Sequence, residues 1–139
     1  MTMEPCVVVV DDEPDLLELV TDILEEDGLQ VLPIDRPERV QTAGHICKPD
    51  LVLMDLMLPG VDGIELARKL QNDGMRGIPM IAMSASQRML SAATRSDLFE
   101  ATLPKPFDLS TLLELVESHV RGNSGESRPD GHPRDSVCA

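Results

Sequence analysis

Aromatic side chains are almost absent from this sequence, which has no Trp, no Tyr and two Phe in 139 residues. A folded core must therefore consist of aliphatic side chains and Met, and the hydrophobic fraction of 42% is high enough for one. Basic residues are also scarce, since 12 Lys and Arg face 25 Asp and Glu and leave a net charge of −13. Phosphate groups are bound by clustered Lys and Arg, so we expect neither a nucleic acid nor an anionic membrane surface as a partner of this chain. The length suggests one folded domain.

Long apolar runs are absent as well. None reaches the roughly 18–20 residues of a membrane span, and the start of the chain lacks the pattern of a signal peptide. The three cysteines, Cys6, Cys47 and Cys138, are odd in number and widely spaced. This is more typical of free thiols in a reducing compartment than of a disulfide framework. We therefore expect a cytoplasmic protein.

Short apolar runs alternate with stretches of helical periodicity along the chain. The predicted strands are 6–10, 29–32, 51–54, 78–83 and 101–103. The predicted helices are 14–27, 37–47, 64–70, 87–95 and 109–120. Five strand–helix pairs predict an α/β domain with a parallel sheet covered by helices on both faces.

Two further segments complete this prediction. Residues 56–63 contain Pro59, Gly60 and Gly63 and are predicted to form a loop. Residues 122–139 have no apolar period and are predicted to be a disordered tail, which leaves 1–121 as the folded domain.

Polar residues follow the predicted strands, at the edge of a parallel sheet where ligands bind. Asp11 and Asp12 come after the first strand, Asp55 after the third, Ser84 after the fourth and Lys105 beyond the fifth. Taken alone, each Asp would be a loop or cap residue, Ser84 a turn hydroxyl and Lys105 a solvated surface charge. Together, the carboxylates repel one another unless a cation lies between them, and oxygen ligands suit Mg²⁺. The sequence therefore predicts a metal site beside a hydroxyl and an ammonium group.

Four motifs carry a resemblance to the receiver domain of two-component response regulators, of the single-domain, chemotaxis type. They are VVVVDDEP at 7–14, LMDLMLPGVDG at 53–63, MSA at 83–85 and PKPF at 104–107. The resemblance covers about residues 4–121. It implies a flavodoxin-like (βα)5 fold with a doubly wound parallel sheet in the strand order 2-1-3-4-5.

The resemblance also implies how the acidic residues act. Asp55 would be the phosphoacceptor. Asp12 would bind Mg²⁺ directly and Asp11 mainly through water, with Asp55 and the backbone carbonyl of Met57 completing the protein's share of the metal shell. Mn²⁺ is the second ion that this set would accept.

The remaining motif residues are implied to bind the phosphoryl group. The Ser84 hydroxyl would donate a hydrogen bond to it and Lys105 would pair with it, with the Lys105–Pro106 bond in the cis form. The phosphoryl donor would be a histidine kinase or a phosphotransfer protein, and the output would pass to an effector protein by direct contact. Such a domain catalyses only its own phosphorylation and dephosphorylation, and we expect a monomer or weak dimer.

One position departs from the family pattern, and two others are expected to influence loss of the phosphoryl group. Thr102 stands where the family usually has the Tyr or Phe that reports phosphorylation, and Phe99 is a candidate substitute. Met57 and Ser86 correspond to the positions that flank the path of the attacking water. Because an apolar Met57 cannot orient that water, we expect slow loss of the phosphoryl group.

Two other functions remain as alternatives. A pseudo-receiver, which acts as a binding module without phosphorylation, is favoured by Thr102. It is opposed by the intact set of Asp11, Asp12, Asp55, Ser84 and Lys105. A phosphatase of the haloacid dehalogenase type would need Asp-x-Asp after the first strand, whereas Asp11-Asp12 is followed here by Glu13. It would also need a cap segment to hold a substrate.

Overall fold

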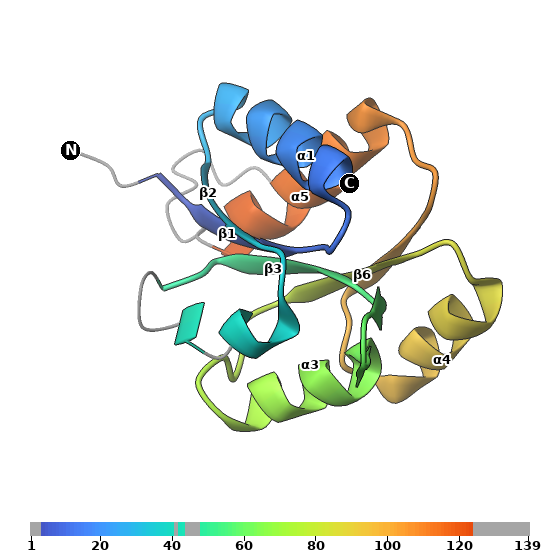
Figure 1. Ribbon diagram of the computed structural model, residues 1–139. Helices are drawn as coiled ribbons and strands as arrows, with labels where there is room; N and C mark the ends of the chain where they lie inside the picture. The colour runs from blue at the N-terminus through green and yellow to red at the C-terminus, as the bar shows by residue number, and fades with distance from the viewer. Residues whose placement is uncertain (1–3, 41, 44–47, 124–139) are drawn as a thin grey trace.

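The computed structural model describes residues 4–40, 42–43 and 48–123, which form a parallel sheet between two layers of helices (Figure 1). The sheet has the strand order β2-β1-β3-β6-β7. Its strands are β1 Cys6–Val10, β2 Gln30–Ile34, β3 Leu51–Asp55, β6 Met80–Ser84 and β7 Ala101–Pro104. Counted without a small separate hairpin, this is the order 2-1-3-4-5, and the predicted fold class is confirmed.

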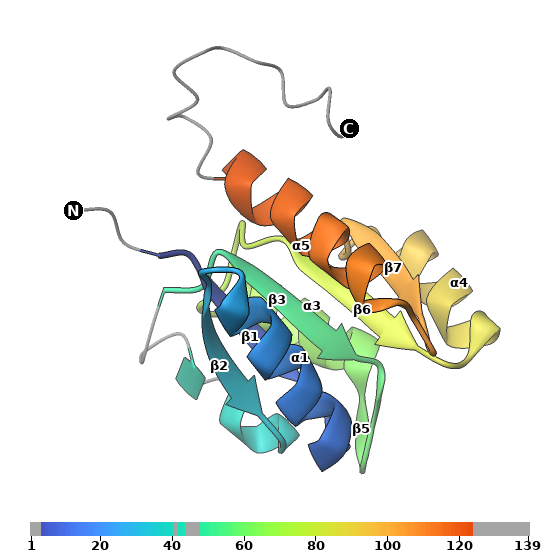
Figure 2. The same ribbon diagram turned by 90° about the horizontal axis from the view of Figure 1, so that it is seen from above.

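Helices cover both faces of the sheet, as the two views show (Figures 1 and 2). The helical segments are α1 Pro14–Glu26, the 3-10 turn η1 Pro37–Arg39, α3 Gly63–Asn72, α4 Gln87–Ser96 and α5 Leu109–Asn123. Helices α1 and α5 lie side by side on one face, and α3 lies on the other. Helix α4 contacts β6 and β7 at the far edge of the sheet.

The core is aliphatic, as the composition predicts. In β1, Val7 and Val9 pack in the cluster that contains residues of α1 and α5, whereas Val8 and Val10 pack in the cluster of α3. All four are 0% exposed. Alternate side chains of a strand point to opposite faces, so a strand covered on both faces is apolar throughout.

The predicted loop at 56–63 contains a short antiparallel hairpin, β4 Met57–Leu58 and β5 Val61–Asp62. The loop prediction is wrong in this detail. Gly60 adopts a φ of +71°, a left-handed conformation that lets the chain reverse between the two pairs of residues. Strands of two residues are too short to leave a periodic pattern in the sequence.

The ends of the other predicted elements differ in smaller ways. The predicted helix at 37–47 begins as η1, and its end at 44–47 lies outside the described residues, as does 124–139 of the predicted tail. Gly122 and Asn123, assigned to that tail, belong to α5. No helix among the described residues is long and apolar enough to cross a membrane.

The expectation of free thiols is wrong for Cys6, which is disulfide-bonded. Cys6 is the single cysteine within 4–40, 42–43 and 48–123. An odd number of cysteines and their wide spacing do not reveal which sulfur atoms the fold brings together, and this is why the expectation failed.

Candidate functional site

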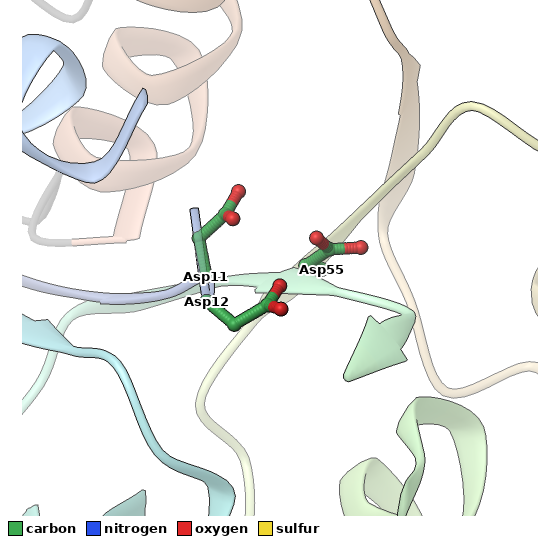
Figure 3. Close-up of side chains that lie close together, drawn as sticks. All are labelled: Asp11, Asp12 and Asp55. Atoms are coloured by element: carbon green, nitrogen blue, oxygen red, sulfur yellow. The ribbon is translucent and has the colours of Figure 1, made fainter. Parts of the chain in front are cut away.

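Three carboxylates meet where β1 and β3 end (Figure 3). Asp55 is the last residue of β3, and Asp11 and Asp12 follow β1, its neighbour in the sheet. One oxygen from each carboxylate lies within 4.8 Å of the others. Asp11 is 1% exposed and Asp55 5% exposed, whereas Asp12 is open to solvent. The predicted acidic cluster is thus present, and it is partly buried.

Lys105 lies between the two buried carboxylates. Its Nζ is 2.9 Å from Oδ2 of Asp11 and 2.9 Å from Oδ2 of Asp55. A third contact, 3.5 Å to Oε1 of the exposed Glu13, was not predicted. The acidic run at 11–13 was visible in the sequence, but nothing in it shows that Glu13 reaches a residue 92 positions away. The Lys105–Pro106 peptide bond is cis, as expected.

Burial shifts the pKa values of two groups in this cluster. Desolvation raises the pKa of Asp11, and neither the N–H of Glu13 nor the ammonium of Lys105 fully offsets it. Burial lowers the pKa of Lys105, but the hydrogen bonds and charges of Asp55 and Asp11 outweigh it and raise that pKa overall. Lys105 is therefore a cation at neutral pH, and one ammonium group faces three carboxylates. The excess negative charge favours a further cation.

Backbone N–H groups fix the orientation of both buried carboxylates. Oδ1 of Asp55 accepts from the N–H of Met57 at 3.0 Å, and Oδ1 of Asp11 accepts from the N–H of Glu13 at 2.9 Å. Each aspartate thus uses one oxygen to anchor itself to the backbone and the other to contact Lys105. This leaves both carboxylates held at the rim with little rotational freedom.

Gly63 lets the loop after Asp55 pass close to α3. A Cβ at this position would lie 2.6 Å from Cα and 2.8 Å from the carbonyl oxygen of Leu56. The N–H of Gly63 donates to that oxygen at 3.2 Å. Since Leu56 directly follows Asp55, this close approach helps to position the acidic residue.

Ser84 is the last residue of β6 and is 0% exposed. Its Oγ accepts from the N–H of Ser86 at 3.0 Å, so its own proton is available to a ligand. Its carbonyl accepts from the N–H of Lys105 at 2.9 Å, which ties the two motifs together. Ser86 caps α4, with Oγ accepting from the N–H of Met89 at 3.2 Å. The structure therefore gives Ser86 a structural task, and its predicted influence on water stays a prediction.

Thr102 and Phe99 occupy different environments. Thr102 lies in β7 opposite Ala82 and is half-buried. Phe99 precedes β7 and packs against the cluster of Leu56, Leu90 and their neighbours under α4. The structure does not place Phe99 at the position of Thr102, and whether it replaces the missing aromatic stays a prediction.

An open cavity of about 910 Å³ adjoins the site. Charged side chains line one side of it, namely Asp12, Glu13, Asp15, Asp55 and Lys105, and apolar side chains line the rest. The apolar part comes from the start of α1, from Met57 and from the segment around Phe107. The cavity therefore opens onto Asp55.

The strand order and the acidic edge define a doubly wound α/β domain of the flavodoxin-like class with an acidic rim. The chain belongs to the family of response regulator receiver domains, whose profile matches residues 7–117. These are the receiver domains of two-component systems, and the resemblance seen in the sequence is confirmed.

Known proteins support this assignment. The DNA-binding response regulator MtrA of Mycolicibacterium smegmatis is 34% identical over 129 residues, which cover 90% of this chain and 54% of MtrA. This chain spans about half the length of such curated relatives. A receiver protein from Pseudomonas putida is 28% identical with a TM-score of 0.76, covering 84% of this chain and 98% of that one. TrrA of Thermotoga maritima, in complex with Mg²⁺–BeF, is 26% identical with a TM-score of 0.72, covering 81% and 96%.

Proposed function

We propose that this chain accepts a phosphoryl group on Asp55 from a histidine kinase or phosphotransfer protein in a Mg²⁺-dependent reaction. The observation that carries the proposal is the position of Lys105, whose Nζ is 2.9 Å from Asp55 and 2.9 Å from Asp11 beside an open cavity. A partly buried cation next to a carboxylate nucleophile is what phosphoryl transfer requires, because the protein contributes mainly positioning and charge stabilisation.

The donor set fits a magnesium ion. Asp11, Asp12 and Asp55 offer hard oxygen ligands within 4.8 Å of one another, and we propose that they hold the ion together with the carbonyl of Met57. When bound, the ion would neutralise negative charge on the carboxylates and on phosphoryl oxygens. The related TrrA was crystallised as a complex with Mg²⁺–BeF, so the proposal is for magnesium rather than Mn²⁺.

The transfer itself would use a carboxylate oxygen of Asp55 as the nucleophile. That oxygen forms a bond to phosphorus while the bond from phosphorus to the donor nitrogen breaks, and the donor histidine keeps the electron pair. The ammonium of Lys105, already at Oδ2 of Asp55, would pair with a phosphoryl oxygen. The buried Ser84 hydroxyl, with its proton free, would donate to another.

Output would pass through contact with an effector protein. MtrA is named a DNA-binding response regulator, but the match covers about half of it. With a net charge of −13, we propose no nucleic acid contact by this chain itself. Membership of the response regulator family, and not the cysteines, supports a cytoplasmic location, and we propose a monomer or weak dimer.

A pseudo-receiver is the second candidate, and one observation favours it. The half-buried Thr102 replaces the aromatic side chain that reports phosphorylation in the family. As a pseudo-receiver, the domain would bind its partner without being phosphorylated, in a single conformation.

Intact mass after incubation with acetyl phosphate and Mg²⁺ separates these functions. The parent protein should gain one phosphoryl group, and Asp55→Asn should gain none. The matched control is Asp62→Asn in the hairpin that follows Asp55, where the side chain caps α3 by accepting from the N–H of Ile64 and lies outside the acidic cluster. It should gain the group as the parent does.

Three results would contradict the proposal. A folded parent that gains nothing favours the pseudo-receiver. A phosphoryl group that persists on Asp55→Asn contradicts the assignment of the acceptor. Turnover of excess small phosphoesters would indicate a phosphatase.

A further inference from the structure

Among the methionines that the structure describes, Met57 is the most exposed to solvent. It is 57% exposed, and with Leu19 it is one of two large hydrophobic side chains that are exposed within the described residues. Four others are at most 1% exposed: Met54, Met75, Met80 and Met83. A soluble oxidant therefore meets the sulfur of Met57 well before it meets those four.

The hairpin fixes Met57 beside the phosphoacceptor. Its N–H donates to Oδ1 of Asp55 at 3.0 Å, and β4 pairs it with Asp62. The next residue, Leu58, is 5% exposed and points into the core, so the side chain of Met57 is left on the solvent side. Met57 lines the same cavity as Asp55 and Lys105. Its thioether is thus at the opening through which water reaches Asp55.

We propose that Met57 is an oxidation site for peroxides, and that its sulfoxide shortens the lifetime of the phosphoryl group on Asp55. The sulfur lone pair attacks one peroxide oxygen, the O–O bond breaks and an S–O bond forms. Sulfur loses two electrons, and hydrogen peroxide is reduced to water. This inference rests on the proposed phosphorylation of Asp55.

The chemical change at Met57 explains the direction of the effect. A thioether is a weak hydrogen-bond acceptor and leaves nearby water unoriented. A sulfoxide carries a polar oxygen, which accepts a hydrogen bond from a water molecule in the cavity and holds it near phosphorus. Hydrolysis of the acyl phosphate needs such a water in line, so the sulfoxide should accelerate it. One neutral hydrogen bond corresponds to a rise of roughly threefold in rate.

The test uses the full chain, dilute hydrogen peroxide and two mass measurements. Peptide masses after a short exposure should locate one added oxygen on Met57 while the four buried methionines stay unmodified. Treated and untreated protein are then phosphorylated with acetyl phosphate and Mg²⁺, the donor is removed, and loss of the phosphoryl group is followed by intact mass. The treated protein should lose it roughly threefold faster.

Two variants isolate the role of the sulfur. Met57→Leu keeps an apolar side chain that peroxide cannot oxidise, so its own decay rate should be the same before and after treatment. An unchanged decay rate in this variant shows that oxidation elsewhere in the chain does not affect the lifetime of the phosphoryl group. Met57→Gln carries a polar amide without oxidation and should lose the group faster than Met57→Leu.

The outcomes separate this inference from the proposed function. If the untreated parent gains no phosphoryl group, both are overturned. If it does gain one, the inference alone is overturned by equal oxidation of the buried methionines, by an unchanged or longer lifetime after treatment, or by an equal response of Met57→Leu.

Discussion

The acidic edge at the ends of β1 and β3 and the region of β7 and α4 are built differently. Every residue of β1 and β3 is buried, whereas in β7 only Leu103 is buried. The first region holds Asp11 and Asp55 by backbone hydrogen bonds and a shared lysine. The second carries the departure from the family pattern, the half-buried Thr102. The difference indicates that the groups proposed to act in phosphoryl transfer are fixed by burial and hydrogen bonds, while the strand that carries Thr102 is more exposed to solvent.

Gly63→Ala should damage the acidic edge most. The added Cβ would lie 2.6 Å from the backbone of Leu56, which cannot move without displacing Asp55. We expect the free energy of unfolding to fall by about 3 kcal/mol, measured by urea denaturation, and phosphorylation by acetyl phosphate to slow. Gly60→Ala is the control, because nothing lies within 4 Å of its Cβ and the cost is that of a left-handed φ, about 1 kcal/mol. Equal losses for the two variants would mean that the close approach at Gly63 is unimportant.

Lys105→Met tests whether this lysine balances the acidic edge. It leaves the carboxylates of Asp11 and Asp55 buried without a cation, which should cost about 2 kcal/mol after allowance for partial solvation. Added Mg²⁺ should raise the thermal midpoint of the variant more than that of the parent, because the ion replaces the missing charge. A smaller rise in the variant would show that Lys105 does not balance these carboxylates.

Phe99→Ala and Thr102→Ala compare two positions of the second region. Phe99 packs against the cluster under α4 while remaining partly exposed, so its truncation should cost about 1.5 kcal/mol. Thr102→Ala should cost about 0.5 kcal/mol or less. Urea denaturation of both variants gives the values. A larger loss for Thr102→Ala would show that β7 is more tightly packed at Thr102 than its exposure indicates.

Asp11→Asn should have the smallest effect, and it should depend on pH. The pKa of Asp11 is raised in the folded state, so protonation of Asp11 stabilises the fold. This stabilisation is fully present at pH values below the ordinary pKa of an aspartate. It is lost as the pH rises through the raised pKa. In metal-free solution, the stability of Asp11→Asn relative to the parent should therefore be higher at pH 7 than at pH 4. Urea denaturation at both values checks this, and the opposite trend would mean that pairing with Lys105 outweighs burial.

Much of the fold could be predicted from local patterns. β1 was located to the residue because a strand buried on both faces is a continuous apolar run. The hairpin after Asp55 was missed because two-residue strands leave no period. The contact of Lys105 with Glu13 and the disulfide of Cys6 were missed because both join groups whose proximity depends on the fold.

The sequence alone determined which chemical groups stand at the strand ends, since the carboxyl ends of parallel strands share one edge. It also determined that the core is aliphatic. Only the tertiary structure decided that Asp11 and Asp55 are buried around one ammonium group while Asp12 and Met57 face the solvent. Burial and distance depend on how the layers pack against each other, and these two quantities determine which carboxylate changes its pKa and which sulfur an oxidant can reach.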